Sequence, residues 1–405
     1  WQILLMSALR DAVQLRDEVR LVGFARLGVE LCREGQVRIA SAVAQVLRMT
    51  VEPKEAGRIR DHMAEPVYVV ETALAQDPQA EPLPVSVDHL AGAIADAIGM
   101  YAAAAELNMR AGRGFDELGD ADSAGFAYQT AGGNWLWLER PEQAVNASSA
   151  AVERFRDSGN LRGEAEALLT YAEAAIEVGD LSRADECVSR VGELVPRLRS
   201  THLTTVWRRT RARIDIALGR SEEAHRLLVQ ALRASRRSGD SELEVVILQD
   251  LAILAESAKG PKRAAQWWRK ALTRAEESGL AARELDIARG ASLNAMETAS
   301  LDAAIGILEQ ATQRHAESRP TPFFERARAE MGALLLARGA RQLSEDGRTS
   351  ADFSLEQGDE ALKTAIAEFV TVGDADWAGR AARNLKLSWR LQGKQCEGTA
   401  LLRSA

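Results

Sequence analysis

Six alanines recur at one fixed phase in this chain, and this repeat constrains the fold more than any other feature. The intervals between them are forty residues four times and then thirty-nine, at Ala104, Ala144, Ala184, Ala224, Ala264 and Ala303. A fixed period of about 20–50 residues is typical of stacked repeat arrays. The sequence therefore predicts a series of similar units, each of which buries its apolar side against its neighbours.

Small residues and turn signals keep the same phase. Twelve residues before each alanine the chain has glycine or alanine, at Gly92, Gly132, Ala172, Ala212, Ala252 and Ala291. Turn residues precede the alanines closely, at Gly99, Gly179 and Gly219, or at Pro141 and Pro261. Proline suits the first position of a helix, and glycine just past a helix end adopts the left-handed conformation. A second turn closes several units, with DSGN at 157–160, RSGD at 237–240 and ESGL at 277–280.

Between these turns the apolar residues follow helical spacing. In one stretch they lie on one face of a helix, at Ala184, Val188, Val191 and Val195. Such spacing predicts an amphipathic helix. Each unit is therefore predicted to be a pair of helices that must pack against the next pair.

This pattern resembles the tetratricopeptide repeat (TPR) family over about 81–319. That family has a helix–turn–helix unit with a small residue midway along the first helix, a glycine near the turn and alanines in the second helix. The residues above match those positions one by one, although the period is near forty instead of about thirty-four. A longer period with longer helices occurs in variants of the family such as kinesin light chain. The large aromatic residues that the family has in its first helix are mostly missing from this chain. The resemblance implies an all-α fold, a right-handed superhelical solenoid of antiparallel helix pairs.

The chain is expected to divide into three parts. Residues 1–80 are predicted to be a helical segment of degenerate repeats, with Ala64 in phase, and 81–319 to hold six TPR-like repeats of about 40 residues. In the third part, 320–405, Gly332 occupies the small position of a first helix. A polar stretch without periodicity at about 341–356 is predicted to be an inserted loop, either a tolerated surface loop or a partner-dependent or cleavable segment. Helices are predicted at 358–371 and 376–392, followed by a short capping helix.

Composition and motifs narrow the class of function. No apolar stretch is long enough to span a membrane. The three cysteines, Cys32, Cys187 and Cys396, are far apart, which argues against a disulfide framework or a zinc site and favours the cytoplasm. No phosphate-binding loop, HExxH or GxSxG motif occurs, and the five histidines are scattered. We therefore expect no catalytic residue, no metal and no cofactor.

Charge is unevenly distributed among the repeats. Residues 201–240 contain nine basic and four acidic residues, whereas 161–200 contain five basic and eight acidic ones. Four arginines fall within six positions, at Arg208, Arg209, Arg211 and Arg213. Either they form a solvated face paired with the adjacent acidic repeat, or they form a patch for an acidic peptide or a phosphate. Nucleic acid is a less favoured ligand, because the chain carries a net charge of −8 and no aromatic residues interleave with the arginines.

In the TPR family the first helices line a concave groove, so the resemblance implies a set of partner-binding positions. They are Phe126, Gln129, Trp137, Glu166, Glu173, Glu177, Arg209, Arg213, Gln249 and Asp250. Such a groove suits an extended or helical peptide, held by a few anchors and by complementary charge. Plain packing between repeats is the alternative role of Trp137. The in-phase Trp268 is expected in the core.

Two functions remain open from the sequence. The first is a non-catalytic scaffold for protein–protein interaction, whose concave groove binds a peptide or another protein. The second is the sensory or regulatory arm of a larger bacterial-type signalling or transcription regulator, whose effector domain is not in this chain.

Overall fold

The computed structural model describes residues 101–316, 322–345, 348–371 and 374–392, together with the single positions 89, 92 and 96. The degenerate repeats predicted at 1–80, the turn at Gly99 and the capping helix beyond 392 lie outside these residues. The chain divides into two compact units, Trp1–Thr210 and Arg211–Ala405, and each is described by itself. Every regular element of the described residues is an α-helix.

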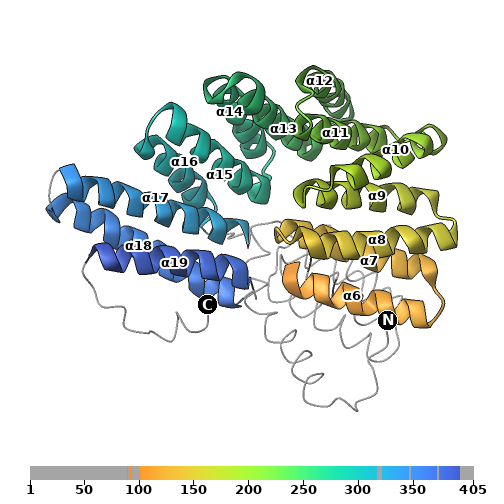
Figure 1. Ribbon diagram of the computed structural model, residues 1–405, viewed down its shortest axis with the longest axis horizontal. Helices are drawn as coiled ribbons and strands as arrows, with labels where there is room; N and C mark the ends of the chain where they lie inside the picture. Colours follow the sequence, from red (N-terminus) through yellow and green to blue (C-terminus); the bar gives the residue numbers. More distant parts are fainter. Residues whose placement is uncertain are drawn as a thin grey trace, which may run out of the picture. The chain divides into compact units, whose positions relative to one another are not determined.

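In the first unit, helices follow one another with turns of two or three residues (Figure 1). They are α6 (Tyr101–Glu117), α7 (Ala121–Trp137), α8 (Pro141–Ser158), α9 (Leu161–Glu177) and α10 (Leu181–Leu198), followed by α11 (Thr201–Ala217), which runs across the boundary between the units. From α6 to α10 each helix packs against the next, and α7 also packs against α9. Because the turns are so short, successive helices are antiparallel, and α7 and α9 are the first helices of two consecutive pairs.

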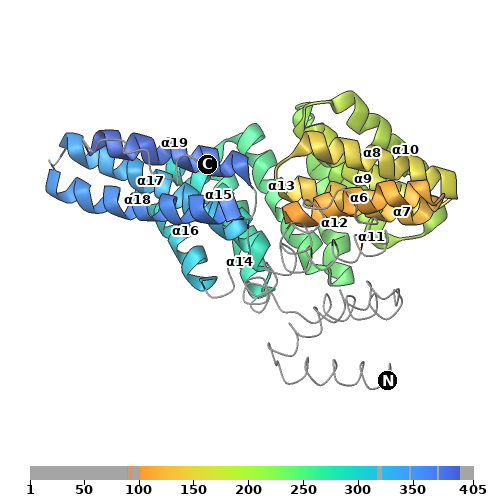
Figure 2. The ribbon, with the colours of Figure 1, turned by 90° about the horizontal axis from the view of Figure 1, so that it is seen from below.

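The second unit continues the same order (Figures 1 and 2). Its helices are α12 (Ser221–Ser238), α13 (Ser241–Lys259), α14 (Pro261–Glu277), α15 (Ala281–Thr298), α16 (Leu301–Arg314), α17 (Phe323–Glu345), α18 (Arg348–Thr371) and α19 (Ala375–Leu391). The first helices α13, α15 and α17 lie along one another, since α15 packs against both of the others. The predicted all-α architecture of TPR-like helix pairs is confirmed.

The turns form for the reasons that the sequence indicated. The side chains of Asp120, Asn160 and Asp180 each accept a hydrogen bond from a backbone N–H three residues later and cap the helix that follows. Gly159 ends α8 with a φ of 73°, in the left-handed region that glycine enters without steric cost. Pro141 and Pro261 each stand in the first turn of a helix, as predicted.

The in-phase alanines are buried, with one correction. Five of them have no exposed surface: Ala104, Ala144, Ala184, Ala224 and Ala264. The predicted sixth, Ala303, is exposed, and its N–H donates to the capping Ser300 Oγ. The buried residue is Ala304, exactly forty residues after Ala264 in the numbering, so the interval of thirty-nine was wrong. Trp268 is 5% exposed, which confirms its place in the core.

The loop predicted at 341–356 is also wrong where the structure describes it. Helix α17 continues to Glu345 and α18 begins at Arg348. The polar residues of this stretch form hydrogen bonds across the helix pair: Arg338 Nε donates to Ser354 Oγ, which donates to Gln342 Oε1. Polar side chains paired in this way support a helical hairpin that an apolar periodicity does not reveal.

Helices α17 and α18 approach closely at two glycines. A Cβ atom at Gly332 would lie 2.9 Å from Leu362 Cγ, and one at Gly358 would lie 3.0 Å from the Gly332 carbonyl oxygen. This contact confirms Gly332 in the small position of a first helix. The helix predicted at 358–371 begins ten residues earlier, at Arg348. Gly358 therefore lies well inside α18.

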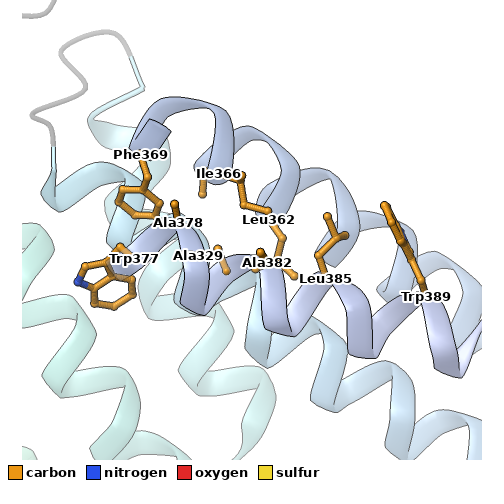
Figure 3. Close-up of a cluster of buried hydrophobic side chains, with 11 residues drawn as sticks. Ala329, Leu362, Ile366, Phe369, Trp377, Ala378, Ala382, Leu385 and Trp389 are labelled. Atoms are coloured by element: carbon orange, nitrogen blue, oxygen red, sulfur yellow. The ribbon is translucent and has the colours of Figure 1, made fainter. Parts of the chain in front are cut away.

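Helix α19 closes the described part of the second unit through an apolar cluster (Figure 3). Its members come from α17, α18 and α19: Ala329, Leu362, Ala365, Ile366, Phe369, Trp377, Ala378, Ala381, Ala382, Leu385 and Trp389. Within this cluster, Trp389 Nε1 donates to the buried Asp359 carboxylate at 3.1 Å. Both tryptophans of α19, Trp377 and Trp389, are therefore core residues.

Candidate functional site

Polar pairs join consecutive first helices. In the first unit, Arg209 forms an ion pair with Glu173, with 2.7 Å between Arg209 Nη1 and Glu173 Oε1. In the second unit Arg213 Nε lies 3.9 Å from Asp250 Oδ1, and Gln249 donates to Asp286 at 3.3 Å. These partners stand 36 or 37 positions apart, because neighbouring first helices lie side by side at almost one repeat's distance.

The pairs are only partly accessible to solvent. The exposed fractions of the Arg209 and Glu173 side chains are 14% and 24%, and those of Arg213 and Asp250 are 20% and 4%. Arg209 therefore pairs with Glu173 of the adjacent acidic repeat, whereas Arg213 lies beside Asp250 of the following repeat.

In the first unit, the equivalent positions of α7 are Gln129 and Gly133, and two aromatic residues, Phe126 and Trp137, flank them. Phe126 is 44% exposed, and its ring stands edge-on to the buried Phe155 ring at 5.0 Å. Trp137 is half-buried and stacks on Tyr101 at 6.3 Å, so packing accounts for one side of its ring. Gly133 lies between Phe126 and Trp137 on α7, and a Cβ atom added there would have no neighbouring atom within 4 Å.

Gln129 lies on the same stripe of α7 as Gly133 and Trp137. Its buried Oε1 atom has no hydrogen-bond partner among the described residues. Leaving a buried acceptor unpaired costs free energy. On the next first helix Glu177 is exposed, and Glu166 pairs with Arg162 at 2.9 Å.

Three apolar residues of the second unit were missed from the sequence. Ile253 on α13, and Leu293 and Met296 on α15, are 39%, 55% and 46% exposed. Positions 173, 213, 253 and 293 are forty residues apart, so Ile253 and Leu293 occupy the position that Glu173 and Arg213 occupy in earlier repeats. That spacing was the signal that could have found them. We call the row formed by Gln249, Ile253, Asp286, Arg289, Leu293 and Met296, on α13 and α15 of the second unit, the first-helix face.

Buried glutamates near the start of the first helices have a structural role. Glu164 is 2% exposed and receives Arg156 from the preceding helix at 2.9 Å and Arg190 from the following helix at 3.2 Å. Burial by itself would raise the pKa of Glu164, but the hydrogen bonds and charges of Arg190 and Arg156 outweigh it and hold that pKa below its ordinary value. Glu244 repeats the arrangement with Arg236 and Arg274 at 2.7 and 2.9 Å.

The described residues contain no cluster of three or more His, Cys, Asp or Glu side chains that could hold a metal ion. Burial raises the pKa of the Cys187 thiol to about 11, so that sulfur is protonated and unreactive near neutral pH. Within the same residues no helix is both long and apolar enough to cross a bilayer.

Comparison with known proteins supports the fold. No protein-family model matches the chain, and no curated protein matches it. Among solved structures, the chain is similar to a Rap protein complexed with competence and sporulation factor, with a TM-score of 0.52 and 13% identity over 92% of this chain and 99% of that one. This likeness shows the TPR-like helical-repeat fold.

Two further structures are less similar. The first is NprR in complex with its cognate peptide NprX, with a TM-score of 0.48 and 12% identity over 84% of this chain and 96% of that one. The second is aspartyl phosphate phosphatase F from Bacillus subtilis, with a TM-score of 0.48 and 9% identity over 84% of this chain and 93% of that one.

Proposed function

We propose that this protein is a non-catalytic interaction scaffold that binds a peptide, or an extended segment of another protein, along the first-helix face. The observation that carries this proposal is the exposure of Ile253, Leu293 and Met296 on two adjacent first helices. Large apolar side chains gathered on a surface and rimmed by polar groups are typical of binding sites.

The polar groups beside these side chains suit a peptide. Gln249, Asp286 and Arg289 lie on the same two helices and offer both donors and acceptors. Apolar side chains of a ligand would bind to Leu293 and its neighbours, and its backbone amides would exchange hydrogen bonds with the polar row. In the first unit, Phe126 and the unpaired Gln129 Oε1 offer the same combination of an apolar anchor and a polar contact.

The similar Rap protein was solved with a bound factor, which makes a ligand-binding role for this fold reasonable here. The proposal that the chain is not an enzyme rests on its sequence, which holds no recognised catalytic motif. We propose that the protein functions in the cytoplasm, because its few, widely spaced cysteines suit a reducing compartment.

A random peptide library displayed on phage, panned against the full chain, supplies the test ligands. Enriched peptides are titrated against the wild type and against Leu293→Glu, with Leu387→Glu on α19 as the matched control. The two leucines are similarly exposed, at 55% and 49%. We expect Leu293→Glu to weaken binding about tenfold to a hundredfold, the equivalent of losing one buried leucine contact, and Leu387→Glu to leave it unchanged. Equal affinities for all three proteins would contradict the proposal.

The second candidate function is the sensory or regulatory arm of a larger bacterial-type regulator. The fold shared with a factor-bound Rap protein is the observation that favours it. In that role, ligand binding on the first-helix face would control an effector domain encoded beside this segment. Reading the genomic sequence on both sides of Trp1 and Ala405 tests this: a fused DNA-binding or nucleotide-hydrolysing domain supports it, and stop codons bounding the segment on both sides contradict it.

A further inference from the structure

The second helices α12 and α14 carry an excess of positive charge that the first-helix face does not use. Helix α12 has four arginines and two glutamates, and α14 has five lysines or arginines and two glutamates. The whole chain, in contrast, has a net charge of −8. Eight of these cationic side chains are exposed, and one of them, Arg236, pairs with Glu244. We call the other seven the basic face: Arg226, Arg233, Arg237, Lys262, Arg263, Arg269 and Lys270.

None of the seven forms an ion pair with a carboxylate of the described residues. The nearby acids of α14 are engaged elsewhere, because Glu276 pairs with Arg314 at 3.1 Å and Glu277 with Arg274 at 3.7 Å. The two glutamates of α12, Glu222 and Glu223, stand in its first turn, where the helix dipole favours negative charge. The basic face is therefore not neutralised within the described chain.

The C-terminal turns of α12 and α14 meet near the start of α13. Helix α13 packs against both α12 and α14. Arg236 of α12 and Arg274 of α14 both reach Glu244 near the start of α13, at 2.7 and 2.9 Å. This shared carboxylate brings the C-terminal turns of α12 and α14 together. It is also an example of one acidic side chain bound by arginines of both helices.

The spacing of the cations follows helical turns. Arg226, Arg233 and Arg237 fall at intervals of seven and four residues, so they form one stripe of about 16 Å along α12. On α14, Arg263 and Lys270 flank the half-buried Trp267, and the Lys270 ammonium lies 4.4 Å from the centre of its ring. An aromatic ring among cations adds an apolar anchor to the charged surface.

We propose that the basic face is a second docking surface, and that it binds an acidic helical segment of a partner protein. Such a segment would carry carboxylates at about i, i+7 and i+11, or at i, i+4 and i+11 in the opposite direction, against the stripe of α12, and an apolar side chain against Trp267. The strongly negative charge of the whole chain opposes a long polyanion such as nucleic acid, whereas a short acidic segment meets only the local positive field. This proposal does not depend on the function proposed for the first-helix face.

The probe is a fluorescein-labelled helical peptide with glutamates at i, i+4, i+7 and i+11 and one leucine, titrated against the full chain. The test variant is Arg233→Glu, Arg237→Glu and Lys270→Glu combined. The control variant, Lys363→Glu, Arg383→Glu and Lys386→Glu, changes the net charge equally at exposed positions of α18 and α19. Thermal unfolding followed by circular dichroism verifies that both variants remain folded.

We expect the wild type to bind the peptide, and the affinity to fall steeply as salt is raised. The test variant should lose about tenfold or more in affinity, and the control variant about twofold or less. The proposal is overturned if the wild type does not bind, or if the two variants lose affinity equally. It is also overturned if a twenty-residue oligothymidylate, or a vesicle containing phosphatidylserine, binds more tightly than the peptide and depends on the same three residues.

Discussion

At the scale of single residues, small side chains determine how closely two helices pack in this array. Ala304 has no exposed surface, and its neighbour Ala303 is exposed at the first turn of the same helix. A close contact between helices tolerates no additional methyl groups, whereas an exposed position accepts them. These two adjacent alanines therefore have opposite tolerance to a larger side chain.

Replacing Ala304 with leucine should lower the free energy of unfolding by about 1–3 kcal/mol, because the larger side chain overpacks the core. Ala303→Leu should change it by less than about 0.5 kcal/mol, as expected for a surface position. Urea unfolding of both variants and the wild type measures the difference. If Ala303→Leu is the more damaging change, the repeat interval is thirty-nine at this point and the assigned phase is wrong.

At the scale of the elements, charged residues join one helix pair to the next. Glu164 is bound by an arginine from the helix before it and by another from the helix after it. Because the carboxylate is buried and the two guanidinium groups are partly exposed, the glutamate bears most of the desolvation cost and depends on both partners.

Glu164→Gln should lower stability at neutral pH by about 1–3 kcal/mol, the range for a hydrogen bond to a charged group. The folded-state pKa of Glu164 is below its ordinary value of 4.5, so the carboxylate stabilises the fold above that pH and loses this contribution as the pH falls towards the lowered pKa. The difference in stability between wild type and variant should therefore shrink below about pH 4.5. Chemical unfolding at a series of pH values measures it, and a difference that stays constant down to pH 2 would refute the argument.

Arg209→Glu tests the pairs between first helices. The change places a second carboxylate beside the partly buried Glu173, and we expect a loss of about 1–3 kcal/mol in unfolding free energy. The control is Arg162→Glu, whose arginine is 68% exposed in a pair with Glu166 and should matter by about 0.5 kcal/mol or less. Similar losses for both variants, measured by thermal unfolding, would mean that Arg209 is solvated in solution.

At the scale of the whole molecule, the forty-residue period carries most of what the sequence could predict. The recurring alanines, the capping side chains and the turn glycines each follow from local chemistry, so the helix pairs were predictable. Ala304 was predictable as well, because a constant interval of forty residues after Ala264 selects it and not Ala303. The helical structure of the predicted loop at 341–356 could not be recognised from the sequence, because this stretch has no apolar stripe. Its polar residues, such as Ser354, form hydrogen bonds across the hairpin instead.

The candidate site was predicted less completely than the fold. The TPR resemblance indicated the positions of Glu173, Arg209, Arg213 and Asp250, and charge favoured pairing with the acidic repeat, but the partner of Arg213 in the following repeat depends on how the helices pack. The apolar Ile253 and Leu293 were not predicted, although the spacing of forty residues places them at positions equivalent to Glu173 and Arg213.

Photo-crosslinking measures whether a peptide binds on the first-helix face. A photoreactive benzoylphenylalanine is introduced at Leu293 in one protein and at Leu387 in another, and each is irradiated with a phage-selected peptide at the same concentration. The account predicts a covalent adduct from position 293, suppressed by excess unlabelled peptide, and none from position 387. Adducts from position 387, with none from position 293, would contradict it.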